Sequence, residues 1–179
     1  MSTSRQMVVA LTDCPARLVP VGTKITIKKD TFVTITQDLG GNYTVVVNGN
    51  MARVDGTDAG ALGLKAEVLE FPSVETTQIS EEHVWTALKS IYDPEIPVNL
   101  ADLGLIYKVS INQPDQKVDV QMTLTAPGCG MGPVLVSDVK YRVAKAPNVK
   151  EVNVDLVFDP PWSRDMMSDE AKLETGMFF

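Results

Sequence analysis

The chain has 179 residues, a formal net charge of −7, and ordinary fractions of hydrophobic and charged residues, 44% and 22%, which suit one globular domain or two small ones. The acidic balance argues against nucleic-acid binding and against attraction to an anionic membrane, and no stretch approaches the roughly 18 uninterrupted apolar residues of a membrane span. With two cysteines, Cys14 and Cys129, and no convincing signal peptide in residues 1–20, we expect a cytoplasmic protein without a disulfide framework.

Residues 1–70 are dominated by alternating β-branched residues and turns. The clearest strand-like runs are 31–36 (TFVTIT) and 43–47 (YTVVV). Asn48-Gly49 follows the second run and predicts a tight two-residue hairpin, because both turn positions need a positive φ. We therefore predict a small, mainly antiparallel β domain over residues 1–70.

The end of this unit is less regular. Gly40-Gly41 and Asp55-Gly56 indicate further turns, whereas residues 59–69 fit either a short helix or a final strand. Residues 71–78 are polar, contain proline and lack a period, so we interpret them as a linker.

Residues 79–179 mix helical and strand periods. The predicted elements are a helix capped by Ser80 that continues to 92, strands at 105–111 and 118–124, a helix at 133–146, a strand at 152–158, and a terminal helix capped by Ser168 that ends near Gly176. This order predicts an α+β domain with a mainly antiparallel sheet and helices on one face of it.

One cysteine in a glycine-rich run carries most of the predicted chemistry. Cys129 lies within 123–133 (TLTAPGCGMGP), flanked by Gly128 and Gly130, where a strand pattern enters and a helix pattern leaves. The thiol is therefore predicted at a helix N-terminus, which favours the thiolate that attacks electrophiles and binds metals.

Neighbouring polar residues could support this thiol. The hydroxyls of Thr123 and Thr125 alternate toward one sheet face, and Thr125 could hydrogen-bond the thiolate. Asp93, Glu95 and Asp102 surround a loop that could face the cysteine run, although Asp93 could equally serve only to turn the chain.

Three long motifs carry a family resemblance. Segments 92–107 (YDPEIPVNLADLGLIY), 122–132 (MTLTAPGCGMG) and 157–173 (VFDPPWSRDMMSDEAKL) resemble the iron–sulfur assembly domain shared by SufT and PaaD-like proteins. The first unit resembles the N-terminal extension of the long form of SufT. The resemblance implies a helix–strand–strand–helix–strand fold, a role in maturation of iron–sulfur proteins, and Cys129 as the functional residue with the DPEIP acids nearby.

Ligand counting limits how such a role could work. A stable cluster usually needs four thiolates, occasionally with histidine substituting, but the chain has two cysteines and one histidine, His83. We therefore expect no permanently bound cofactor and at most a transient iron–sulfur cluster. Its ligand Cys129 would be shared across a homodimer or with a carrier or scaffold protein, before transfer to recipient apoproteins.

Two other classes of function stay open. A cysteine-nucleophile enzyme is weakened because His83, expected as a solvated surface residue, is the sole candidate base, so we predict no catalytic residues. A passive interaction module would leave the thiol unused, and Asp159 and Trp162 of the DPPW turn could then be local packing or part of a partner surface. We interpret Cys14 as structural or incidental.

Overall fold

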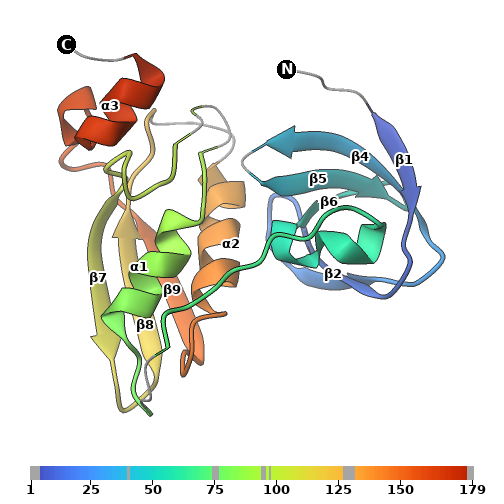
Figure 1. Ribbon diagram of the computed structural model, residues 1–179, viewed down its shortest axis with the longest axis horizontal. Coiled ribbons are helices and arrows are strands. Elements are labelled where there is room, and N and C mark those ends of the chain that lie inside the picture. Colours follow the sequence, from blue (N-terminus) through green and yellow to red (C-terminus); the bar gives the residue numbers. More distant parts are fainter. Residues whose placement is uncertain are drawn as a thin grey trace. The chain divides into compact units, whose positions relative to one another are not determined.

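The chain forms two compact units, Met1–Leu69 and Glu70–Phe179, each with its own hydrophobic core. The computed structural model describes residues 5–39, 41–73, 77–93, 96, 98–126 and 132–176. Figure 1 shows the strands of the first unit and the mixed helices and strands of the second.

The first unit is a six-stranded antiparallel sheet followed by a short 3₁₀-helix. The strands run in the order β1-β4-β5-β6-β2-β3. The elements are β1 (Gln6–Val9), β2 (Cys14–Leu18), β3 (Lys24–Ile27), β4 (Phe32–Leu39), β5 (Asn42–Val47), β6 (Asn50–Val54) and η1 (Gly56–Leu62).

The predicted hairpin between β5 and β6 is confirmed. Asn48 and Gly49 have φ angles of 50° and 79°, the two positive values that a tight turn between twisted strands requires. The sequence pattern does not predict β1 and β2, which are both short. In β2, Pro15 and the small buried residue Ala16 occupy positions where a strand pattern typically has large β-branched residues.

The ambiguous segment after β6 is a 3₁₀-helix in its first part only. Asp55 begins η1 by accepting a hydrogen bond from the Thr57 N–H at 3.0 Å, and Gly63 ends it with φ 76°. Residues 64–69 have no regular secondary structure, so neither a full helix nor a final strand forms.

The second unit places its helices and strands in the predicted order. Its elements are α1 (Glu81–Lys89), β7 (Ile106–Asn112), β8 (Lys117–Met122), α2 (Gly132–Val143), β9 (Glu151–Leu156), the 3₁₀-helix η2 (Arg164–Met166) and α3 (Asp169–Thr175). The α+β prediction is confirmed, and α1 and α2 cover the same face of the sheet (Figure 1).

The sheet itself is mixed, which corrects the expectation of a mainly antiparallel one. Its order is β7-β8-β9. The β7–β8 pair is an antiparallel hairpin, but β8 and β9 are parallel. Helix α2 forms a crossover connection between β8 and β9. It carries the chain back to the end of the sheet at which β8 begins, so β9 runs in the same direction as β8.

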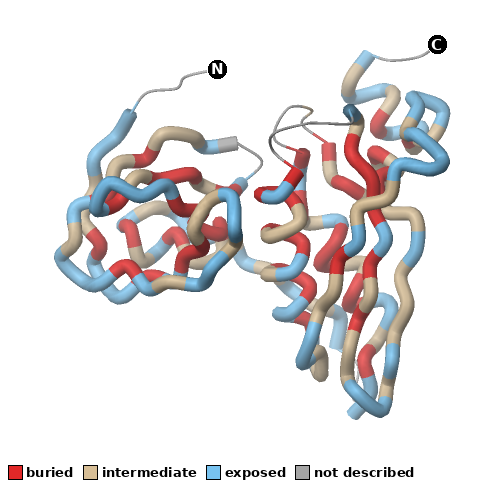
Figure 2. Tube along the Cα trace, turned by 180° about the vertical axis from the view of Figure 1, so that it is seen from behind, coloured by how far each residue is buried: buried red, intermediate tan, exposed pale blue. Residues whose placement is uncertain are grey.

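Strand β8 shows how the sheet separates its two faces. Three apolar residues are buried and the three polar residues between them are half-buried or exposed: Val118, Val120 and Met122 alternate with Lys117, Asp119 and Gln121. Because successive side chains of a strand point to opposite faces, one face packs under the helices and the other stays open. Figure 2 shows this alternation of burial along the sheet.

Helix α1 ends three residues earlier than predicted, at a contact with α2. The fully buried Arg142 uses Nη1 to donate to the Ser90 carbonyl oxygen at 2.9 Å and to the Ser90 hydroxyl at 3.1 Å. A cation here satisfies a terminal carbonyl and complements the negative end of the helix dipole. The chain then leaves the helix at Ser90.

The C-terminal helix is capped as predicted. The Ser168 hydroxyl accepts a hydrogen bond from the Ala171 N–H at 3.1 Å, and Gly176 ends α3 with φ 71°. These two caps explain why so short a helix forms at this position.

The segment between β9 and α3 is fastened to the loop before β7. The Trp162 indole N–H donates to the Leu103 carbonyl oxygen at 2.7 Å, and the Ser168 N–H donates to the Asp102 carbonyl oxygen at 2.7 Å. Gly104 has φ 77°, and a Cβ added there would overlap the backbone carbonyl of Met166. Only glycine allows the two segments to approach this closely.

We predict that Gly104→Ala destabilises the second unit strongly. The left-handed backbone costs about 1–2 kcal/mol for alanine, and the overlap with the Met166 backbone adds about 1–3 kcal/mol. Denaturant unfolding followed by tryptophan fluorescence measures this, because the two tryptophans, Trp85 and Trp162, both lie in the second unit.

Gly176→Ala is the matched control for this variant. Gly176 has a similar φ of 71°, but no heavy atom lies within 4 Å of the added Cβ, so only the backbone cost of about 1–2 kcal/mol applies. Equal losses of unfolding free energy in the two variants would contradict the close approach at Gly104.

Candidate functional site

The predicted thiol run joins β8 to α2. Cys129, Gly128 and Gly130 lie outside the residues that the structure describes, which resume at Gly132. Cys129 is three residues from each described end, Ala126 and Gly132. The predicted strand before the run and the predicted helix after it are confirmed, while the position of the thiol stays a prediction.

The end of β8 is held from both sides. The Thr123 N–H donates to the Leu105 carbonyl oxygen at 2.8 Å, and the Val157 N–H donates to the Met122 carbonyl oxygen at 2.8 Å. The start of the cysteine run is therefore fixed between the segment that leads into β7 and the segment that leaves β9.

The two threonines of the run differ in their surroundings. Thr125, which the sequence favoured, is half-buried. Thr123 is fully buried, and its hydroxyl oxygen has no hydrogen-bond partner among the described residues. Leaving a buried hydroxyl unsatisfied costs about 1–3 kcal/mol, so Thr123 joins the candidate residues on structural grounds that the sequence did not contain.

The first turn of helix α2 contains no acidic residue, whereas its last turn contains Lys140 and Arg142. Gly132 packs closely, since a Cβ there would lie 2.9 Å from Leu124 Cδ1. Within the described first turn, no carboxylate offsets the positive end of the helix dipole.

The described acids of the DPEIP region shape their own loop. The carboxylate Oδ1 of Asp93, which is 8% exposed, accepts a hydrogen bond from the Ile96 N–H at 2.9 Å. Asp102 Oδ2 accepts from Asn99 Nδ2 at 2.7 Å, and the Asp102 N–H donates to Asn99 Oδ1 at 3.0 Å. Glu95 lies outside the described residues, and the proximity of these acids to the thiol stays a prediction.

The expectation that His83 is a solvated surface residue is wrong. It is 1% exposed, and its ring lies edge-on to Phe71 with centroids 5.6 Å apart. Its Nε2 donates to the Pro72 carbonyl oxygen at 2.6 Å, and its Nδ1 has no hydrogen-bond partner in the described part of the chain. Burial results because the predicted linker folds back over α1 at Phe71 and Pro72.

The residues of the DPPW turn have different environments. Trp162 is half-buried, packs against the core of the second unit and donates to Leu103, so it has a structural role. Asp159 is exposed beside an open hollow that also contains Tyr107, Pro160 and Met166. A partner surface at Asp159 stays a prediction.

The described residues provide no ready metal site. Within the described ranges, no group of three or more His, Cys, Asp or Glu side chains is arranged to hold a metal ion. No helix of the same ranges is both long and apolar enough to cross a bilayer.

Cys14 is buried in the core of the first unit. It is 0% exposed, and burial raises the pKa of its thiol to about 11, with a smaller contribution from the Asp58 carboxylate. The thiol therefore stays protonated at neutral pH and is a poor nucleophile or metal ligand there.

Glu70–Phe179 is a small α+β domain, and the sequence between its β8 and α2 contains Cys129. Residues 81–156 match the model of the family described as iron–sulfur cluster assembly protein. The chain belongs to this family.

Curated relatives and a solved structure agree with this assignment. A Porphyromonas gingivalis protein named Fe-S protein maturation auxiliary factor is 50% identical over 97 residues, which are 54% of this chain and 91% of that protein. The Bacillus subtilis Fe-S protein maturation auxiliary factor YitW is 40% identical over 97 residues, 54% of this chain and 94% of that one. The crystal structure of a domain of unknown function DUF59 from Bacillus anthracis matches with a TM-score of 0.51 and 37% identity, and covers 54% of this chain and 92% of that one.

These comparisons confirm the family resemblance stated from the three motifs. Each match spans about half of this chain and nearly the whole length of the relative. The assembly domain is therefore the part of the chain that these proteins share.

We predict that Cys14 resists alkylation in the folded protein. At pH 8, three units below a pKa of about 11, about one thiol in a thousand is ionised, and burial excludes the reagent as well. Intact-mass analysis of Cys129→Ser treated with iodoacetamide should show almost no adduct until denaturant is added. Rapid labelling of that variant in native buffer would contradict the buried position of Cys14.

Proposed function

We propose that this chain is an auxiliary, non-catalytic factor in the maturation of iron–sulfur proteins. We further propose that Cys129 supplies one ligand to a short-lived cluster shared with another protein. The observation that carries the proposal is membership of the iron–sulfur cluster assembly family, with Cys129 inside the matched residues 81–156. Relatives named as maturation auxiliary factors support the same role.

The chemistry of the chain favours a shared cluster over a resident one. The whole chain contains two cysteines and one histidine, whereas a cluster usually takes four thiolates. Cys14 lies in the core of the first unit with a raised pKa, and His83 is buried with Nε2 already bonded. Cys129 is the remaining soft ligand, so other ligands must come from outside the chain.

The surroundings of the cysteine run support a reactive thiol. The run enters α2 at an N-terminus without an acidic side chain in the first turn, which favours a thiolate close to it. The buried hydroxyl of Thr123 has no partner among the described residues and could donate a hydrogen bond to a thiolate or to a cluster sulfur held in the loop.

A cysteine-nucleophile enzyme fits the described residues less well. Such an enzyme needs a general base within hydrogen-bond reach of the thiol. The chain's one histidine, His83, is buried against Phe71 and donates to the Pro72 carbonyl oxygen. We therefore propose carrier or scaffold proteins, recipient apoproteins and a second copy of this chain as the partners, acting in the cytoplasm.

We predict that Cys129→Ser fails to support iron–sulfur maturation. A serine hydroxyl stays protonated at neutral pH and is a poor ligand for iron, so the activities of cluster-dependent enzymes in a deletion strain should fall severalfold relative to wild type. Cys14→Ala is the matched control, because it removes the other cysteine without leaving a buried hydroxyl. Full restoration of activity by Cys129→Ser would refute the role of the thiol.

We also predict that the purified chain holds a cluster only weakly. Anaerobic reconstitution with iron and sulfide should give charge-transfer absorbance that depends on Cys129 and is lost on gel filtration, because one thiolate cannot retain a cluster. Adding a small thiol such as glutathione should prolong the signal. A stable, stoichiometric cluster on a single chain would contradict the shared site.

A further inference from the structure

A hollow lies on the face of the second unit's sheet that the helices do not cover. It is open, with a volume of about 680 Å³, within the range of small-molecule sites. Lys108 of β7 and Gln121 of β8 line it, and they are register partners with exposed side chains. The hollow therefore differs from both the helix-covered core and the cysteine run.

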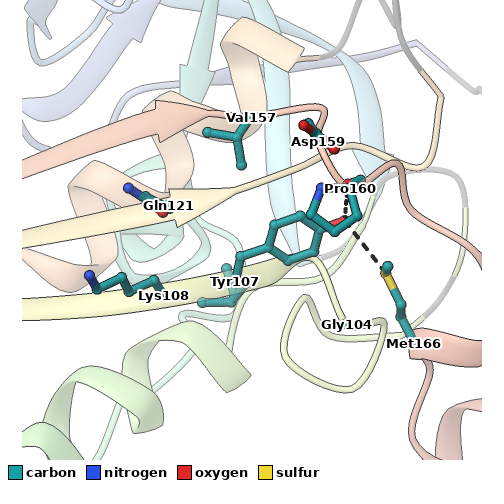
Figure 3. Close-up of a pocket in the computed structure, with 9 residues that line it drawn as sticks. Gly104, Tyr107, Lys108, Gln121, Val157, Asp159, Pro160 and Met166 are labelled. Atoms are coloured by element: carbon teal, nitrogen blue, oxygen red, sulfur yellow. Dashed lines mark hydrogen bonds between the residues drawn. The ribbon is translucent and has the colours of Figure 1, made fainter.

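Two distant segments of the chain meet to form this hollow. Tyr107 donates its hydroxyl hydrogen to the Pro160 carbonyl oxygen at 2.8 Å and lies 3.5 Å from the Met166 sulfur (Figure 3). Gly104 allows the Met166 backbone to approach. The wall is thus fixed by hydrogen bonds and close packing between the loop before β7 and the segment after β9.

The lining has an apolar centre and polar ends. Tyr107, Val157 and Met166 provide apolar surface, while Lys108 and Gln121 lie toward one side and Asp159 toward the other (Figure 3). The ion pairs described for this sheet use Lys117, with Asp119 and Glu151. Lys108 is therefore placed to receive an acidic group from an occupant.

Strand β7 also offers a backbone edge beside the hollow. In the described sheet, β7 pairs with β8 on one side and ends the sheet on the other. An extended segment can add to such an edge through main-chain hydrogen bonds. Its alternate side chains, about 7 Å apart, then lie on one face of the sheet.

We propose that the hollow and the β7 edge bind an extended segment of a partner protein. An apolar side chain of that segment packs over Tyr107 and Met166, and an acidic side chain two positions away pairs with Lys108. The partner is a protein that carries or receives a cluster, a choice that rests on the proposed function. Gln121, which lines the hollow, lies one residue before the end of β8, from which the chain leads into the cysteine run.

The test uses the full chain and a short fluorescein-labelled peptide with glutamate, leucine and lysine at alternate positions and threonine between them. Fluorescence polarisation should show saturable binding to wild type. Lys108→Glu should weaken it by about tenfold, since an attraction becomes a repulsion, and a peptide in which only the glutamate is replaced by lysine should recover affinity for that variant. Replacing the peptide leucine by alanine should also weaken binding, with no effect on the fold of the protein.

Lys140→Glu is the matched control, because Lys140 is exposed on α2 and its change alters net charge equally. Cys129→Ser should bind the peptide like wild type, so loss of maturation activity and loss of docking are distinguished. No binding to wild type, equal binding to wild type and Lys108→Glu, or equal loss in both lysine variants overturns the proposal. Sedimentation that shows a dimer abolished by Lys108→Glu, without peptide binding, would assign the surface to a second copy instead.

Discussion

The buried contact between Arg142 and the end of α1 determines how the second unit presents its loops. A fully buried guanidinium is costly unless its donors are satisfied, and here it donates to both the carbonyl and the hydroxyl of Ser90. This contact ends α1 and joins it to α2. The chain after Ser90 must then turn at once, and the Leu100 N–H closes the turn by donating to the Ile91 carbonyl oxygen. The turn closed by Ile91 and Leu100 therefore begins at the end of α1 that contacts α2.

A second set of contacts holds the segment after β9 against the loop before β7. Gly104 lets the Met166 backbone approach the loop before β7, and Trp162 and Ser168 hydrogen-bond to that loop. The C-terminal segment is consequently part of the fold and not an appendage. Its position creates the hollow beside Tyr107, close to the end of β8 from which the cysteine run departs.

The distribution of soft ligands then limits the chemistry. Cys14 is buried in the core of the first unit and His83 is buried against Phe71, so Cys129 is the remaining thiol of the chain for the proposed cluster. Under the proposed function, partner proteins supply the other ligands. The hollow on the open face of the sheet is lined by Gln121, one residue before the end of β8, from which the chain leads into the cysteine run.

Local sequence features predicted the order of the main helices and strands of the second unit, the β5–β6 hairpin and the family resemblance, because periodicity, turn residues and long motifs are local features of the chain. Val118, Val120 and Met122 predicted their burial through alternation, and Asn48-Gly49 predicted its turn through backbone geometry. Local patterns do not predict that His83, Arg142 and Thr123 lie in the interior, or that β9 runs parallel to β8. Each of these features depends on a partner elsewhere in the chain: Pro72 for His83, Ser90 for Arg142, Leu105 for Thr123, and the α2 crossover for β9. Burial of a polar group is decided by what packs against it, and a local pattern does not contain that information.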